Sequence, residues 1–223
     1  MITDYKNLTI GQYNAILAVA ENEPVEENRN PQILAVLTGK TVAELEAMPL
    51  VDFVGMMRKA GFLTVPPKPA KTRKNYACGP FTLVPVLDFK KITTAQYIDF
   101  QTLSKRDGGP AIVEVLSCLM IPEGRKYCDG YDPADVQTAI RDNMSVEDAI
   151  SLYSFFTGRL LSLTRRIATS LNRMARRLPR SQRETMQKTL QTLPTGLQAV
   201  GDGLRMLTPF QKLSALIGTQ YGA

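Results

Sequence analysis

The stretch that most constrains the fold of this chain is residues 160–178, where apolar and cationic positions separate with helical periodicity. Steps of three and four residues place the apolar side chains on one side of a helix. These side chains are Leu160, Leu163, Ile167, Leu171, Met174 and Leu178. The other side carries Arg165, Arg166, Arg173, Arg176 and Arg177, and Arg180 follows. Residues 158–183 hold eight arginines and no carboxylate. The sequence therefore predicts an amphipathic helix whose two faces bind chemically different partners.

The positive charge of the chain is concentrated near this helix. The formal net charge is +6. Residues 151–223 hold 11 Lys and Arg against 2 Asp and Glu, whereas residues 1–150 hold 16 against 19. A basic region of this kind attracts polyanions or acidic protein surfaces.

Cysteine usage and the N-terminal residues indicate the cellular compartment. Cys78, Cys118 and Cys128 are an odd number of thiols without a CxxC motif, which favours free thiols in a reducing compartment. The first ten residues lack the basic and apolar regions of a signal peptide. No apolar run approaches the roughly 20 residues that span a bilayer. We expect an intracellular protein, or a component of a particle assembled inside a cell.

Three short blocks occur twice in the same order. Residues 8–13 resemble 92–97, residues 31–39 resemble 110–118, and residues 48–52 resemble 144–148. The offsets are 84, 79 and 96 residues, so insertions lie between the blocks. We interpret residues 1–63 and 91–157 as two copies of one helical unit. The alternative is chance similarity between amphipathic helices.

These patterns predict a mainly α protein. We expect two related helical lobes (1–63 and 91–157), a Pro- and Lys-rich linker with a short extended segment (64–90) and a basic amphipathic helical arm (158–223). Thr9, Thr41 and Ser145 are the predicted helix caps. Residues 21–30 are expected to form a loop, followed by a helix that starts at Pro31 and has Gly39 just past its end. Pro85 predicts that the extended segment is an edge strand.

Motifs for catalysis are absent from the sequence. There is no histidine, so the commonest general base and transition-metal ligand is missing. We find no zinc-site spacing, phosphate-binding loop or GxSxG motif. The acidic pairs at 26–27 and 147–148 fit helix caps or loops better than catalysis, and residues 129–135 do not follow the EF-hand pattern. We predict no catalytic residue, cofactor or metal, and hence no enzyme.

The arginine face has four possible explanations. Runs of charge are usually solvated helix faces, but like charges one turn apart destabilise a helix by a few tenths of a kcal/mol each. A groove in a partner protein, nucleic acid or a membrane surface could offset that repulsion. Nucleic-acid binding usually adds aromatic side chains, and none follows Phe156 in this helix. The apolar face favours a protein partner.

The N-terminal copy resembles small tail and baseplate assembly proteins of tailed phages, such as tail assembly chaperones. The resemblance rests on residues 8–13, 31–39 and 41–50, covers residues 1–63 and extends more weakly over 91–157. The linker and the basic arm depart from that family. The resemblance implies a non-catalytic helical protein that binds other tail or baseplate proteins during assembly, as an assembly chaperone or a minor virion component. We expect it in the host cytoplasm during assembly, with retention in the virion and homo-oligomers as open alternatives. Nucleic-acid-binding cargo or a packaging factor is the alternative function.

Overall fold

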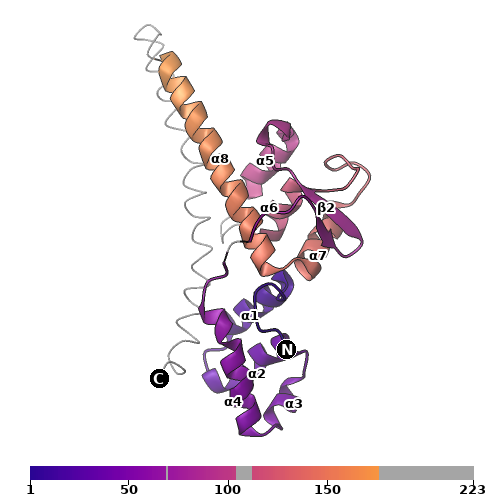
Figure 1. The fold of residues 1–223 in the computed structure, drawn as a ribbon, viewed down its shortest axis with the longest axis vertical. Coiled ribbons are helices and arrows are strands. Elements are labelled where there is room, and N and C mark those ends of the chain that lie inside the picture. Colours follow the sequence, from indigo (N-terminus) through magenta and orange to yellow (C-terminus); the bar gives the residue numbers. More distant parts are fainter. Residues whose placement is uncertain (69, 104–111, 176–223) are drawn as a thin grey trace.

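The computed structural model describes residues 1–68, 70–103 and 112–175 (Figure 1). Within these ranges the protein is mainly helical, as predicted, and includes one small antiparallel sheet. The helices are α1 (Ile10–Asn22), α2 (Glu26–Thr38), α3 (Val42–Glu46), α4 (Leu50–Ala60), α5 (Thr94–Leu103), α6 (Ile112–Leu119), α7 (Pro133–Asn143) and α8 (Val146–Ala175). Two short 3-10 helices are η1 (Gly61–Thr64) and η2 (Phe89–Lys91), and the strands are β1 (Tyr76–Cys78), β2 (Phe81–Pro85) and β3 (Met120–Pro122).

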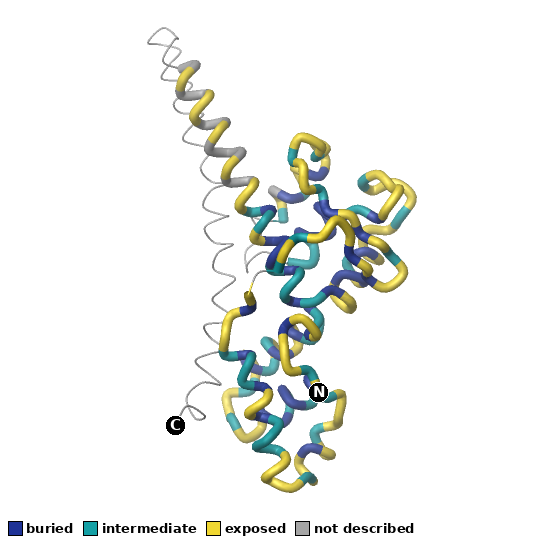
Figure 2. Tube along the Cα trace, viewed as in Figure 1, coloured by how far each residue is buried: buried dark blue, intermediate teal, exposed yellow. Residues whose placement is uncertain are grey.

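The helices form two groups, each with its own apolar core. In the first lobe, α2 contacts α1, α3 and α4 around buried side chains such as Ile16 and Leu34. In the second lobe, α6 contacts α5, α7 and α8 around Leu116, Ile140 and Phe156. The lobes are stacked along the long axis of the molecule (Figures 1 and 2). Both lobes therefore place their second helix at the centre, although the duplication itself stays a prediction.

Local sequence signals set most helix ends. Thr9 and Thr41 form capping boxes with the residues three positions later, Gln12 and Glu44. Ser145 accepts a hydrogen bond from the backbone of Asp148 at 3.1 Å. Helix α2 ends at Thr38, and the next residue, Gly39, is its C-cap, with a φ of 73° that is left-handed and suits glycine. The predicted caps and this C-terminus are confirmed.

The start of α2 differs from the prediction. The helix begins at Glu26 rather than at Pro31, so most of the expected loop over residues 21–30 is helical. Proline inside a helix removes one backbone hydrogen bond and costs about 3 kcal/mol. Here Arg29, Asn30 and Pro31 are all buried. Packing of this turn against the first lobe offsets the local preference.

The sheet lies in the second lobe, and the edge-strand prediction for residues 81–87 is wrong. Strand β2 is the middle strand, paired with β1 on one side and β3 on the other. Gly79 (φ 55°) and Pro80 connect β1 to β2, in the order that suits a type II′ hairpin turn. Part of the predicted linker thus packs in a core, through Tyr76, Cys78 and Leu83.

Pro85 is tolerated in a central strand because of its position. It is the last residue of β2 and faces Met120 of β3. The neighbouring Val86 donates its amide hydrogen to Leu119 at 2.9 Å, so the ring nitrogen of Pro85 points away from β3. Strand β1 pairs only as far as Leu83 and does not reach this position. The missing N–H therefore costs no ladder hydrogen bond.

The two lobes are joined where two helices begin. Thr9, the cap of α1, and Ser145, the cap of α8, form an isolated antiparallel bridge. Its hydrogen bonds run from the amide of Ile10 to the carbonyl of Met144 (3.1 Å) and from Val146 to Leu8 (2.8 Å). The side chain of each donor is buried in the core of the opposite lobe: Val146 of α8 in the first core and Ile10 of α1 in the second. The junction is thus part of both cores.

Candidate partner-binding helix

The base of α8 is fixed in the second lobe. Ala149, Leu152 and Phe156 are buried on one side of its first three turns. Glu147 and Asp148 lie in the first turn, where their charges favour the positive end of the helix dipole. These contacts fix the start of α8 in the second lobe, and this sets the direction of the rest of the helix.

An extended segment before β1 also holds this base. The amide of Ala70 donates to Oγ of Ser151 at 2.6 Å, and that hydroxyl donates to the carbonyl of Glu147 at 2.6 Å. Arg73 pairs with Asp148 at 3.4 Å. The predicted linker therefore packs across α8. Sequence reasoning missed these contacts, because residues 75 and 81 positions apart leave no periodic signal.

Beyond Phe156, α8 leaves the body. It continues for 19 residues to Ala175, roughly 28 Å at 1.5 Å per residue. All the side chains that the structure describes from Gly158 onward are exposed: Gly158, Arg159, Ser162, Arg166, Thr169, Ser170 and Arg173. Figures 1 and 2 show the helix rising past the second lobe with an exposed flank. Helix α8 runs through Gly158 without a break.

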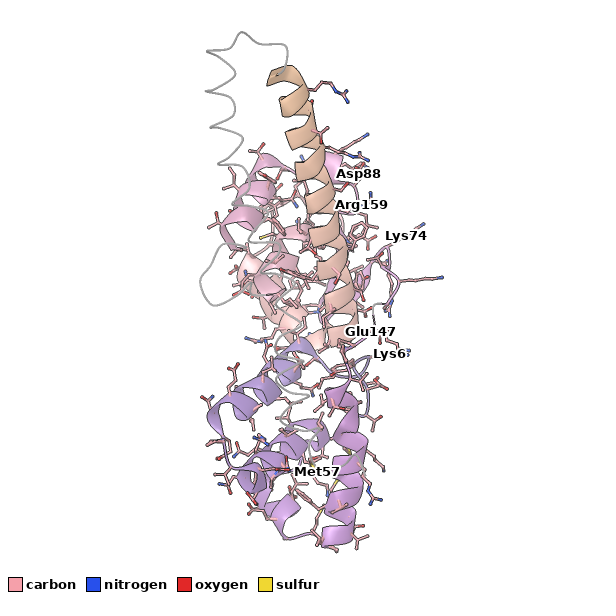
Figure 3. All side chains as sticks on the ribbon, turned by 90° about the vertical axis from the view of Figure 1, so that its left-hand side faces the viewer. Lys6, Met57, Lys74, Asp88, Glu147 and Arg159 are labelled. Atoms are coloured by element: carbon pink, nitrogen blue, oxygen red, sulfur yellow. The ribbon has the colours of Figure 1, made fainter. Side chains whose placement is uncertain are left out.

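Three exposed arginines form a row along this flank. Arg159, Arg166 and Arg173 are seven residues apart, or about 10.5 Å along the axis, and drift only about 20° per step. Ion pairs within the described residues join Arg73 to Asp148 and Arg141 to Asp142, and neither includes these arginines. The guanidinium carbon of Arg159, which is labelled in Figure 3, lies 5.3 Å from the centroid of the Phe155 ring. The row is therefore open to an acidic partner.

The predicted binding residues divide into three groups. Arg166 and Arg173 are exposed on α8. Six positions are described as helical backbone only: Leu160, Leu163, Arg165, Ile167, Leu171 and Met174. Three lie outside the described residues: Arg176, Arg177 and Arg180. The structure thus brings the described arginines onto one helix. Whether the apolar positions form a docking stripe stays a prediction.

Side chains of the loop at residues 123–133, which contains two tyrosines, make hydrogen bonds that stabilise the fold. Tyr127 donates a hydrogen bond to a carboxylate oxygen of Asp99 at 2.7 Å, and burial followed by this bond raises the pKa of Tyr127. Asp132 caps α7 through the amide of Ala134 at 2.8 Å. Burial raises the pKa of Cys118 to about 11, so this thiol is protonated near neutral pH and is a poor nucleophile.

A shallow groove runs along β2 and β3 with a volume of about 550 Å³. Its lining includes Lys74, Lys91 and Arg125 together with Asp88 and Glu123. Charges of both signs at its rim give it no clear preference for an anion or a cation. In the described part of the chain, no three His, Cys, Asp or Glu side chains are close enough to hold a metal ion.

Comparisons with known proteins do not indicate a function for this chain. No protein-family model, curated protein or solved structure matches the chain. None of the described helices, α8 included, combines the length and apolar composition needed to cross a membrane. The exposed arginine row on α8 is therefore the candidate site with the clearest chemistry.

Proposed function

We propose that this protein binds other proteins without catalysis during assembly of a phage tail or baseplate. Helix α8 is the contact, and its partner presents carboxylates along a groove or helix. The observation that carries the proposal is the row of Arg159, Arg166 and Arg173, exposed on a helix that projects from a folded body. The resemblance of residues 1–63 to tail assembly proteins supplies the setting.

The three arginines lie on one continuous helix and belong to neither ion pair found among the described residues. Three cations at intervals of about 10.5 Å match carboxylates at the same spacing on a partner helix. Single exposed ion pairs contribute at most about 1 kcal/mol, so the row acts collectively. Complementary charge mainly speeds encounter and sets specificity. A contact of this kind suits an assembly factor that binds and releases its partners.

The test is reversal of the row in the full chain. We expect R159E/R166E/R173E to abolish complementation when the chain is supplied in trans to a tail-assembly system lacking it, with complete tails counted by electron microscopy. The matched control is R58E/K59E/K126E, which reverses three exposed charges away from α8. Normal tail numbers with the α8 variant would refute the proposal.

Nucleic acid is the rival partner because phosphates also complement exposed arginines. Binding would then weaken steeply with salt, with a log–log slope near one per phosphate contacted. A gel-shift titration of the full chain with duplex and single-stranded DNA at two salt concentrations measures this slope. Loss of such binding in R159E/R166E/R173E, but not in the control triple variant, would favour the rival.

A further inference from the structure

The junction between the lobes has an unused counterpart elsewhere on the molecule. The alignment of the two predicted copies pairs Thr9 with Thr93, and Ser145 with Pro49. Thr93 and Gln96 form the same reciprocal hydrogen bonds as Thr9 and Gln12, at 3.0 and 3.2 Å. Pro49 caps α4 as Ser145 precedes α8. The chain therefore carries a second pair of helix starts equivalent to the pair that joins the lobes.

This second pair cannot close within one chain. Figure 1 shows α4 at one end of the stacked lobes and α5 at the other. The first pair is closed in the same view, where α1 meets the base of α8. Each lobe thus has two such helix starts, one in the junction within the chain and one at an outer end of the molecule. We call the two outer helix starts, at Pro49 before α4 and at Thr93 before α5, the open corners.

The open corners expose apolar side chains that are covered at the closed junction. Val146 is 2% exposed, and its counterpart Leu50 is 74% exposed. Tyr13 is 7% exposed, and its counterpart Tyr97 is 41% exposed. Two neighbours extend these surfaces, Val51 at 82% and Ile98 at 55%. Large apolar side chains clustered at both outer ends indicate surfaces for association.

The two open corners also carry opposite charge. Lys90 and Lys91 are exposed just before α5, and Glu46 and Asp52 are exposed around the start of α4. The closed junction also joins segments of unlike charge: the amide of Glu147 donates to the carbonyl of Tyr5, next to Lys6 in the chain, at 3.4 Å, and Figure 3 labels Lys6 and Glu147 in this region. A contact between an α4 corner and an α5 corner would therefore join unlike charges.

The backbone of the open pair can form the same bridge. At the closed junction the amides of Ile10 and Val146 donate, and the amide of Ser145 takes no part. Pro49, which has no amide hydrogen, thus fits the position of Ser145. The corresponding donors are Leu50 and Thr94, first residues of α4 and α5. Amides at this helix position have no intrahelical acceptor and need an outside partner.

We propose that a second copy of this chain docks its α5 corner (Lys90, Lys91, Thr93, Tyr97, Ile98) on the α4 corner (Glu46, Pro49, Leu50, Val51, Asp52) of the first. The contact repeats the junction between the lobes. Because the two corners are different surfaces, the contact is heterologous and leaves one corner free on each chain. Repetition builds a ring or a filament of lobes in head-to-tail order.

Paired cysteines test the register of this contact. In the full chain carrying C128S, which removes the exposed native thiol, we expect P49C/T93C to form a ladder of disulfide-linked dimers, trimers and larger species on a non-reducing gel. The matched control is T9C/S145C, which joins the closed junction. Its hydrogen bonds mark a non-hydrogen-bonded antiparallel pair, about 4.5 Å between Cα atoms and within disulfide range. It should cross-link within one chain and stay monomeric.

The outcomes of this experiment are decisive. Oxidised T9C/S145C with monomeric P49C/T93C would overturn the proposal. Dimers formed equally by P49C alone or by T93C alone would also overturn it, because they indicate a symmetric contact instead. R159E/R166E/R173E in the P49C/T93C background should still give the ladder, since α8 takes no part. Failure of the proposed function is therefore distinguishable from failure of this contact.

A second measurement needs no cysteine. Leu50 and Val51 are exposed, so L50E/V51E should fold normally while weakening self-association by about tenfold or more in sedimentation velocity, which corresponds to about 1.4 kcal/mol. The control V25E/V65E places the same charges on exposed valines elsewhere and should leave association unchanged. A wild-type chain that stays monomeric at its highest soluble concentration would refute the contact.

Discussion

The two lobes share one helical frame and differ in what their last helix does. In both, a central helix, α2 or α6, contacts the three others. In both, the first helix starts with a threonine–glutamine capping box. The first lobe ends in the 11-residue α4, whereas the second ends in the 30-residue α8. The second lobe also has the sheet.

The last helix of each lobe is buried at one end and exposed at the other, and the buried end differs between α8 and α4. The start of α8 is buried in the junction, and its far end carries the arginine row. The start of α4 is exposed, and its C-terminal half packs into the first core through Met57 and Ala60 (Figure 3). One helix is thus anchored at its start and open at its end, and the other is the reverse. The comparison predicts different responses to the same mutation at the starts of these two helices.

The largest expected effect comes from the central helices. Leu37 of α2 and Leu116 of α6 are equivalent in the predicted duplication, and both are buried. Leu37→Ala and Leu116→Ala should each lower the free energy of unfolding by about 2–5 kcal/mol, because each leaves a cavity. Since the cores share the junction, we expect one cooperative transition in urea, followed by circular dichroism, that both variants shift. Two transitions, each moved by one variant only, would mean that the lobes fold independently.

A smaller and asymmetric effect is expected at the two last helices. Val146→Ala removes two buried methyl groups from the first core and should cost about 1.5–3 kcal/mol. Leu50→Ala, at the equivalent position, changes an exposed side chain and should stay within about 0.5 kcal/mol in dilute protein. Urea titrations at one low concentration measure both. Equal losses would show that Leu50 is buried in the dilute chain, against the comparison.

Sequence signals predicted the parts of the fold that depend on neighbouring residues. The caps at Thr9, Thr41 and Ser145 and the C-cap of α2 at Gly39 all follow from side chains within a few positions. These elements need no knowledge of the tertiary structure. The mainly α class follows from them.

The parts that sequence reasoning missed depend on distant contacts. The start of α2 is fixed by burial around Pro31, and the place of β2 in the sheet by its pairing with β3, almost 40 residues away. At the candidate site, helical spacing predicted Arg166 and Arg173, but not Arg159 in the same row or the ion pair of Arg73 with Asp148 that holds the base of α8. Such contacts leave no periodic pattern in one sequence.

The smallest expected effect tests the feature that the lobes share most closely. Thr9→Ala and Thr93→Ala each remove a cap oxygen that accepts an amide hydrogen bond, at 3.3 and 3.2 Å. Each should cost about 1 kcal/mol in urea denaturation. The controls, Thr9→Ser and Thr93→Ser, keep the oxygen and should recover most of the loss. Thr9→Ala could lower the free energy of unfolding much more than Thr93→Ala does, without recovery in Thr9→Ser. That result would mean that the Thr9 side chain contributes mainly through packing at the junction. Equal costs would mean that both caps act on their own helices, as the shared geometry of the two boxes requires.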